Sequence, residues 1–593
     1  MLQPETHKPP RKNFAFLQIL VLGLFCVLLL RLWYFQIFKG EDYAVKAQEN
    51  RLRHQTIYAP RGLIRDRDSR ILAENKPAYA LGLIREDCPD IDRTLRQIST
   101  WTDIPIKQLQ KRFSKDKGLV KPFKPQLIVS NLTYGELAKI ESHLMEWPGL
   151  QIVTRPLRSY PHGEIVSHVI GYVAQVNEKE LRQHPDLQLR DNIGKQGIEL
   201  TKEETLRGEK GSKQIEVDAQ GRVLKEHIVK QSVPGKNIRL SIDLDLQEHA
   251  WEHLGNNTGA VVVLEPQTGH VLSLVSKPGY NNNHFVQGIA PQTWQELVSD
   301  PQHPLQNRAI QSTYPPASVF KLVVTSAVLQ NDTVSPEKKF YCPGFYKLGR
   351  RTFRCWKEYG HGWLELKEGI KQSCDVYFYK LGEELGVDPL SQYAQRYGFG
   401  SRTDIDLPNE KSGLIPDREW KLRRFGRRWQ GGETLNMSIG QGYTLVTPLQ
   451  VARYVAALIN GGRLLKPQLL RNVPPETQKT LPLQEEELQR IQEAMIATVD
   501  EPHGTAWRLR MKGADIGAKT GTAQVVKLFE KYKDKETHEI PYKLRDHAWM
   551  ASFGRHEGQE YVVVTLVEHG GHGSTAAGPV VKAIYDYLFD EAR

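Results

Sequence analysis

The longest apolar run of the chain lies near its start and extends from Phe14 to Leu32. A helix rises 1.5 Å per residue, so a run of this length is about enough to cross a hydrocarbon core of about 30 Å. Gln18 and Arg31 are its strongly polar interruptions. The pattern predicts a transmembrane anchor over residues 13–38, preceded by a short segment, residues 1–12.

The basic residues Lys8, Arg11 and Lys12 stand before this run, and the positive-inside rule then predicts a cytoplasmic N-terminus. A cleaved signal peptide is the alternative, but no small-residue cleavage site follows the run, which continues into Trp33 and Tyr34. Beyond Gly40 no second apolar run of spanning length occurs. We therefore expect a single-pass protein of the cell inner (cytoplasmic) membrane whose bulk is periplasmic.

Residues 39–235 are polar and segmented. Short strand-like runs, such as residues 56–60 and 80–84, alternate with Pro, Gly and charged helical stretches such as residues 92–100. This pattern is typical of a pedestal domain rather than of an active-site domain.

Residues 236–593 have a different pattern. An alternating strand leads into a helix over 237–254, and residues 258–276 form two apolar runs joined by a Pro-Gln-Thr-Gly turn. Two more strand-like runs at 547–555 and 561–569 precede an amphipathic helix at 580–592. The pattern predicts an α+β domain in which helices flank an antiparallel sheet.

Composition narrows the function classes. The chain has 593 residues, of which 39% are hydrophobic and 25% charged, so a folded multidomain protein is expected. The net charge is +11, but Lys and Arg are scattered, and zinc-finger spacing and a Walker loop are absent. We expect no nucleic-acid partner.

Candidate chemistry begins at Ser318 and Lys321, which are spaced so that a helix places them on one face. A serine nucleophile needs a base within reach, and a buried lysine loses its proton more easily. The same S-x-x-K pattern recurs at residues 114–117 and 335–338, but in charged surroundings. Ser318 instead follows Pro315 and Pro316 and opens an apolar helix, which favours it as the nucleophile.

Two further motifs follow in the chain. The first is Ser373-Cys374-Asp375, and the second is Lys519-Thr520-Gly521-Thr522, which follows a β-prone run. A glycine in such a strand permits close approach of an extended substrate to the backbone.

The three motifs in this order resemble the signature of penicillin-binding proteins and serine β-lactamases. The resemblance extends along nearly the whole chain to the class B penicillin-binding proteins, and among them to the cell-elongation group called penicillin-binding protein 2. It is carried by these segments: residues 61–67 with Leu72-Ala73, 168–172, 197–199, 307–309 and 438–442. Two positions depart from the common pattern, namely Ser69, where glycine is usual, and Asp375, where Asn is commoner.

The resemblance implies a transpeptidase domain of the penicillin-binding and β-lactamase fold on an elongated pedestal domain of the dimerisation type. It also implies the activity of a serine-type D-Ala-D-Ala transpeptidase that cross-links peptidoglycan stem peptides during cell elongation. It implies Ser318 as the nucleophile, which β-lactams acylate, with Lys321 as base. Ser373 and Asp375 would complete the proton relay. Thr520, Gly521 and Thr522, assisted by Lys519, would bind the substrate carboxylate and form the oxyanion site.

The resemblance also implies partners, namely a polytopic lipid-II glycosyltransferase and scaffold proteins of the elongation machinery. Two alternatives share the fold: a β-lactam-binding sensor, and a hydrolase such as a D,D-carboxypeptidase or β-lactamase. A sensor is expected to carry several membrane spans or a large cytoplasmic effector, whereas only about a dozen residues precede this helix.

A cluster of cysteines lies within the transpeptidase region. Cys342, Cys355 and Cys374 enclose His361, and such a Cys3His set can hold a tetrahedral structural zinc. One disulfide with a free thiol, or three unbonded cysteines, are the alternatives outside the cytoplasm. Because Cys374 is the middle residue of the second motif, zinc here would position Ser373 and Asp375 without touching substrate.

Overall fold

A computed structural model describes residues 11–43, 52–116, 120, 122–184, 186–187, 191–217, 223–525, 535 and 539–590. Most of the predicted segment 1–12, with Lys8, lies outside these residues. The chain forms two compact units, each built from three segments. The first comprises residues 1–60, 77–156 and 209–234, and the second comprises residues 61–76, 157–208 and 235–593. The predicted domain boundary at residue 235 stays a prediction.

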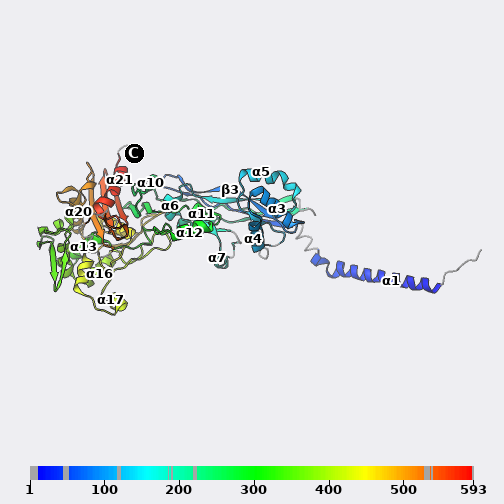
Figure 1. Ribbon diagram of the computed structural model, residues 1–593, viewed down its shortest axis with the longest axis horizontal. Helices are drawn as coiled ribbons and strands as arrows, with labels where there is room; N and C mark the ends of the chain where they lie inside the picture. The colour runs from blue at the N-terminus through cyan, green and yellow to red at the C-terminus, as the bar shows by residue number, and fades with distance from the viewer. Residues whose placement is uncertain are drawn as a thin grey trace, which may run out of the picture. The chain divides into compact units, whose positions relative to one another are not determined.

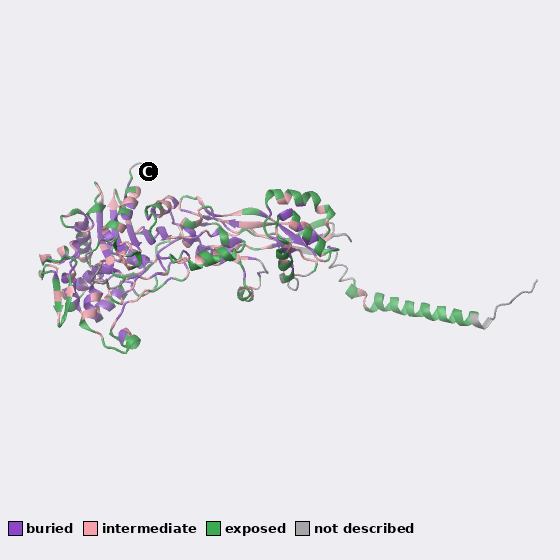
Figure 2. Cartoon of the chain, viewed as in Figure 1, coloured by how far each residue is buried: buried purple, intermediate pink, exposed green. Residues whose placement is uncertain are grey.

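An apolar helix opens the described chain. Helix α1 (Arg11–Trp33) continues into the π-helical turn η1 (Tyr34–Phe38). The stretch Phe14–Phe38 has a mean hydropathy of 2.5, and its side chains are exposed along the whole length (Figure 2). By length and composition this helix can cross a membrane, as the sequence predicts.

The first unit contains a three-stranded antiparallel sheet in the order β1–β8–β9, formed by Leu52–Ile57, Gly211–Val217 and Val223–Lys230. A separate apolar core joins α3 (Ile91–Thr102), α4 (Ile106–Asp116) and α5 (Tyr134–His143) to β4 (Gln126–Val129) and β5 (Leu150–Ser159). Helix α3 confirms the helix expected at residues 92–100. Asp90 begins it by accepting a 2.9 Å hydrogen bond from the Arg93 amide.

The second unit is built on a five-stranded antiparallel sheet with the order β12–β11–β21–β20–β19. Its strands are β11 (Gly259–Leu264), β12 (Val271–Lys277), β19 (Asp515–Ala523), β20 (His547–His556) and β21 (Gln559–Val567). The hairpin predicted at 258–276 and both late strands are confirmed.

Helices cover both faces of this sheet, because alternate side chains of each strand point to opposite sides. Val261 and Val263 pack with α10 (Leu244–His253) and α21 (Gly578–Leu588), whereas Ala260 and Val262 belong to the core that contains α13 (Lys321–Gln330) and α19 (Pro448–Ile459). Figure 1 shows α10 beside α21 in this unit. The α+β fold with flanking helices is therefore confirmed.

Shorter elements complete the second unit. Its further strands are β2 (Ile64–Arg65), β6 (Val173–Gln175), β7 (Asn192–Gly194), β10 (Ile238–Arg239), β13 (Phe340–Cys342), β14 (Phe345–Leu348), β15 (Arg351–Arg354), β16 (Gly362–Leu364), β17 (Arg463–Leu465) and β18 (Thr477–Thr480). Its further helices are α6 (Gly163–Ile170), α7 (Glu178–Gln183), α8 (Gly197–Thr201), α9 (Glu203–Arg207), α11 (Asn283–Val286), α12 (Pro291–Ser299), α14 (Leu366–Lys371), α15 (Asp375–Leu385), α16 (Val387–Arg396), α17 (Arg418–Phe425), α18 (Gly431–Ser438) and α20 (Glu485–Asp500). Strand β3 (Ile71–Leu83) contributes residues to both units.

A buried ion network lies in the second unit, on α8. The fully buried Glu199 carboxylate accepts from Arg61 Nε at 2.5 Å and from Arg158 Nε at 2.6 Å. Although burial alone would raise it, these two guanidinium groups hold the pKa of Glu199 below its ordinary value. The network joins residues 61–67 to residues 197–199, two of the segments that resemble class B proteins.

Candidate active site

Ser318 lies on a short 3-10 turn, η3 (Ala317–Phe320), which runs directly into α13. The residue before it, Ala317, has φ of 49°, a left-handed conformation that is strained for alanine. The Ala317 amide donates to the Gly440 carbonyl oxygen at 2.9 Å, which holds this turn in place. Ser318 is half-buried, and its hydroxyl has no hydrogen-bond partner among the described residues.

Lys321 begins α13 and is fully buried. Its Nζ atom lies within hydrogen-bond distance of three oxygens of the second motif: the Ser373 carbonyl oxygen at 2.9 Å, Ser373 Oγ at 3.3 Å and Asp375 Oδ1 at 2.7 Å. Ser373 lies between α14 and α15 with φ of 52°, so its backbone is also held in a left-handed conformation. The structure thus brings the first and second predicted motifs into direct contact.

Lys519 joins them from β19. Its fully buried ammonium donates to Ser373 Oγ at 2.8 Å, so this hydroxyl oxygen lies within hydrogen-bond distance of both lysines. Burial, and then the neighbouring charge of Lys321, lower the pKa of Lys519 well below its ordinary value. A lysine with a lowered pKa gives up its proton more readily than an exposed lysine, which suits a proton relay through Ser373.

Strand β19 stands at the edge of the sheet, paired on one side with β20. An edge strand can pair with an extended peptide through its backbone. Gly521 brings this strand against η3, because a methyl group there would lie 3.3 Å from both the Pro316 carbonyl oxygen and Val319 Cγ2. Thr520 and Thr522 are half-buried, and Thr520 Oγ1 donates to Thr505 Oγ1 at 3.1 Å.

The segment 438–442 connects the two walls of the site. Gly440 accepts from the Ala317 amide beside the serine, while Gln441 Nε2 donates to the Thr522 carbonyl oxygen at 3.2 Å. Gly440 has φ of 68°, and a methyl group there would lie 2.2 Å from the Ala317 carbonyl oxygen. This segment therefore positions η3 and β19 relative to each other.

Trp356 is a site residue that the sequence reasoning missed. Its amide donates to Asp375 Oδ2 at 2.9 Å, and its indole Nε1 donates to the Ser373 carbonyl oxygen at 3.1 Å. Both oxygens of the Asp375 carboxylate are thus engaged, one by Lys321 and one by Trp356. The sequence offered one indication of this role: Trp356 directly follows Cys355, a residue of the cysteine cluster.

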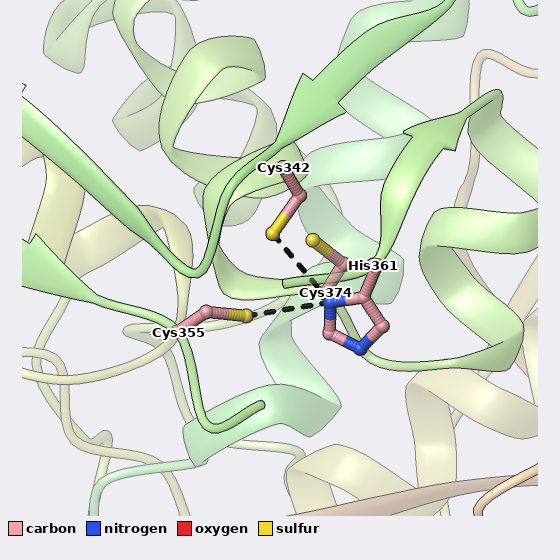
Figure 3. Close-up of side chains that lie close together, drawn as sticks. All are labelled: Cys342, Cys355, His361 and Cys374. Atoms are coloured by element: carbon pink, nitrogen blue, oxygen red, sulfur yellow. Dashed lines mark hydrogen bonds between the residues drawn. The ribbon is translucent and has the colours of Figure 1, made fainter. Parts of the chain in front are cut away.

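Cys342, Cys355, His361 and Cys374 do come together, and Figure 3 shows their side chains pointing toward one another. Their candidate ligand atoms all lie within 4.8 Å of one another. The Sγ atoms of Cys342 and Cys355 each lie 3.6 Å from His361 Nδ1. The four residues come from β13, the end of β15, the segment before β16 and the N-cap of α15.

The two sulfur–nitrogen distances fit a tetrahedral zinc. With Zn–S of about 2.3 Å and Zn–N of about 2.0–2.1 Å, tetrahedral angles place a sulfur and a nitrogen ligand about 3.5–3.6 Å apart. The three sulfur ligands are buried, and no disulfide joins the cysteines of the described chain. The donor set, three thiolates and an imidazole, is one that zinc prefers.

Comparison with known proteins agrees with this geometry. The family model for the penicillin-binding protein transpeptidase domain matches residues 259–586, and that for the penicillin-binding protein dimerisation domain matches residues 56–240. The peptidoglycan D,D-transpeptidase MrdA of Haemophilus influenzae is 33% identical over 98% of this chain and 92% of its own length. MrdA of Escherichia coli is 34% identical over 98% and 94%.

Solved structures show the same likeness. The penicillin-binding protein (PBP2) of Helicobacter pylori in complex with MreC has a TM-score of 0.81 and 31% identity, covering 91% of this chain and 98% of its own. A peptidoglycan synthase complex described as coordinating polymerisation and cross-linking has a TM-score of 0.72 and 29% identity, covering 98% of each chain. On these matches and the three converging motifs, the chain belongs to the class B penicillin-binding protein transpeptidases, in the penicillin-binding protein 2 group.

Proposed function

We propose that this protein is a serine D,D-transpeptidase that cross-links peptidoglycan stem peptides outside the cytoplasmic membrane. The observation that carries the proposal is the convergence of Lys321 and Lys519 on Ser373 Oγ, beside the turn that bears Ser318 and the edge of β19. The MrdA relatives, named as peptidoglycan D,D-transpeptidases, support it.

In the first half-reaction the Ser318 oxygen attacks the carbonyl carbon between the two terminal D-alanines of a donor stem peptide. Lys321 takes the hydroxyl proton, and the backbone N–H groups of Ser318 and Thr522 stabilise the oxyanion of the tetrahedral intermediate. The C–N bond then breaks, D-alanine leaves with the proton on its amine, and an ester joins the acyl group to Ser318.

In the second half-reaction a side-chain amine of another stem peptide attacks this ester. The amine loses a proton, the C–O bond to Ser318 breaks, and the serine oxygen regains a proton, so the enzyme returns unchanged. Ser373 Oγ passes protons between Lys321 and Lys519, and Asp375 holds Lys321 in place. Thr520 and Thr522, with Lys519, bind the carboxylate of the donor peptide, which pairs along β19.

The cellular setting follows from the anchor and the relatives. The helix α1 holds the protein in the inner membrane with its N-terminus cytoplasmic and its bulk periplasmic, since basic residues precede it. The Helicobacter pylori relative forms a complex with MreC, and this supports a scaffold protein as a partner of the present chain. The synthase complex supports a glycan-polymerising partner. Both relatives support the proposal that this protein acts in the elongation of rod-shaped cells.

We further propose that Cys342, Cys355, His361 and Cys374 hold one structural zinc. Four protein ligands leave no position for water or substrate, so the ion would supply rigidity and no acyl-transfer chemistry. Cys374 separates Ser373 from Asp375, and Cys355 precedes Trp356, so the cluster would fix Asp375 together with its partner Trp356.

Elemental analysis tests the zinc directly. Purified protein should contain about one zinc per chain, and Cys342→Ser should lose it and lower the melting temperature. Cys88→Ser is the matched control, since Cys88 is buried but outside the cluster, and should retain zinc. A disulfide between cluster cysteines with no bound metal would refute the zinc proposal and leave the transpeptidase proposal standing.

Ser318→Ala tests the nucleophile. The variant should lose labelling by a fluorescent penicillin, while Ser335→Ala, in another S-x-x-K copy, should label like wild type. Mass spectrometry of products from purified stem peptides then separates the functions: cross-linked peptide supports the transpeptidase, loss of D-alanine alone indicates a carboxypeptidase, and acylation without any product indicates a sensor.

A further inference from the structure

A second concave site lies in the same unit as the catalytic residues, and none of the motifs accounts for it. It is a pocket of about 830 Å³ between the β14–β15 hairpin, α17 and the start of α18. Its aromatic walls are Phe353, Phe425 and Tyr443, and the backbone of Gly431 and Gly432 forms part of its lining. We call it the α17 pocket.

The charge of the α17 pocket is strongly positive. Arg351, Lys421, Arg427 and Arg428 line it, against one acidic residue, Glu433. Lys421 already pairs with Glu433. The guanidinium groups of Arg351, Arg427 and Arg428 form no hydrogen bond or ion pair within the part of the chain that the structure describes, and all three side chains are exposed. Three unpaired guanidinium groups in one pocket are suited to binding carboxylates, because a guanidinium group can donate two parallel hydrogen bonds to a carboxylate.

The α17 pocket is connected to the reaction centre by short stretches of chain. Tyr443, on its wall, is two residues from Gln441, which donates to the Thr522 carbonyl oxygen. Phe353, on the opposite wall, is three residues from Trp356, which donates to Asp375. The pocket lining and the reaction centre therefore share two short stretches of chain, residues 353–356 and 441–443.

We propose that the α17 pocket binds the carboxylates of the acceptor stem peptide, the one whose amine attacks the acyl-enzyme. This inference rests on the proposed transpeptidase function. The donor peptide occupies the edge of β19, so the acceptor needs a separate site, and an anionic peptide complements the unpaired arginines. Binding there raises the effective concentration of the amine at the ester over that of water, which favours transfer over hydrolysis.

The test uses the full-length protein after acylation by penicillin, so that the donor site is blocked. The probe is a soluble stem peptide that bears a free side-chain amine and free carboxylates, compared with the same peptide carrying primary amides in place of the carboxylates. The variant Arg427→Glu with Arg428→Glu should bind the free peptide at least tenfold more weakly than wild type. If the arginines bind the carboxylates, removing either group removes the same interaction. The amidated peptide should therefore bind both proteins equally weakly.

Control variants sharpen the test. Arg427→Lys with Arg428→Lys should keep at least half of the binding free energy. Arg424→Glu, on α17 but outside the pocket lining, should bind like wild type. Acylation by fluorescent penicillin should stay within twofold of wild type in every variant, because it needs no acceptor. The yield of cross-linked product relative to hydrolysed donor should fall at least tenfold in the double Glu variant.

Two outcomes would overturn the inference. Unchanged peptide binding and cross-linking in the double Glu variant would show that the α17 pocket does not take the acceptor, while wild-type cross-linking would keep the transpeptidase proposal intact. Loss of binding to vesicles of anionic phospholipid, with peptide binding unchanged, would assign the pocket to a membrane surface. Absence of any cross-linking by wild type would instead contradict the transpeptidase proposal, and the binding measurement would still decide the pocket.

Discussion

Ser69 lies in the tight turn between β2 and β3, where the buried Asp66 carboxylate accepts from the Asp68 and Arg70 amides at 2.9 and 2.8 Å. Its φ of 72° is left-handed, which costs an L-residue about 1–2 kcal/mol, a cost that glycine would avoid. The Ser69 side chain is exposed and contributes no hydrogen bond among the described residues.

Ser69→Gly should therefore stabilise the second unit. The relief of strain exceeds the extra entropy that glycine brings to the unfolded chain, about 0.5–1 kcal/mol, so we expect a net gain of about 0.5–1 kcal/mol and a melting temperature about 1–2 °C higher. Ser69→Ala, which keeps the Cβ, should not stabilise. Differential scanning calorimetry checks both, and a lower melting temperature for the glycine variant would contradict the strain argument.

That the candidate residues would meet was predictable from their spacing: Ser318 and Lys321 lie one turn apart, and Lys519 stands two residues before a glycine in a strand. Their catalytic roles stay predictions. The contacts of Trp356 were not predictable, since any residue could supply its backbone amide and its indole Nε1 reaches the Ser373 carbonyl oxygen only in the folded chain. Its contact with Asp375 depends on the path of the chain after Cys355. The sequence also does not predict that the arginines of the α17 pocket lie together, because Arg351 and Arg427 are brought into one pocket only by the tertiary fold.

At the scale of elements, the ion network on α8 ties segments that are far apart in the chain. Glu199→Ala would leave the guanidinium groups of Arg61 and Arg158 buried with their main counter-charge removed, which costs about 3–5 kcal/mol. We expect a large fall in the melting temperature of the second unit. Glu203→Ala is the control, since Glu203 pairs with Arg61 alone of these two arginines. Equal effects of the two variants would contradict a central role for Glu199.

The elements themselves were largely predictable where the pattern was strong. The apolar runs at 258–276 form the predicted hairpin, and the two late strand-like runs form β20 and β21. The amphipathic pattern near the end of the chain forms α21. The short strands β13 to β16 escaped the sequence reasoning, because they have three or four residues each and pair only in twos. Such strands lack a repeating pattern, and their geometry depends on the turns and on the cysteine cluster that they surround.

At the scale of the whole molecule, two histidines predict a loss of stability in mild acid. Burial lowers the pKa of His168 to about 4, and burial together with His569 lowers the pKa of His547 to about 4. The unfolded chain binds these protons near pH 6.5, so between pH 6.5 and 4 the unfolded state binds more protons than the folded state. Stability therefore falls as the pH falls through this window, and below about pH 4 these residues add no further loss.

Melting temperatures measured from pH 7.5 to 4 check this behaviour. The double variant His168→Gln with His547→Gln should show a shallower fall between pH 6.5 and 4 than wild type, even if it is less stable at pH 7.5. His227→Gln is the control, because His227 is exposed on β9, and it should leave the slope unchanged. A slope equal to that of wild type in the double variant would remove both histidines as the cause.

The second unit is covalently discontinuous, and this limits how the protein can be taken apart. The chain passes between the two units five times, after residues 60, 76, 156, 208 and 234. Residues such as Ile64, Val169 and Ile198, from the early segments, belong to the same apolar core as α13 and α19. A fragment that starts at residue 236 would leave that core open to water. The catalytic unit is therefore expected to be inherited, exchanged between proteins and expressed as a block with the first unit, because a single cut in the chain cannot separate them.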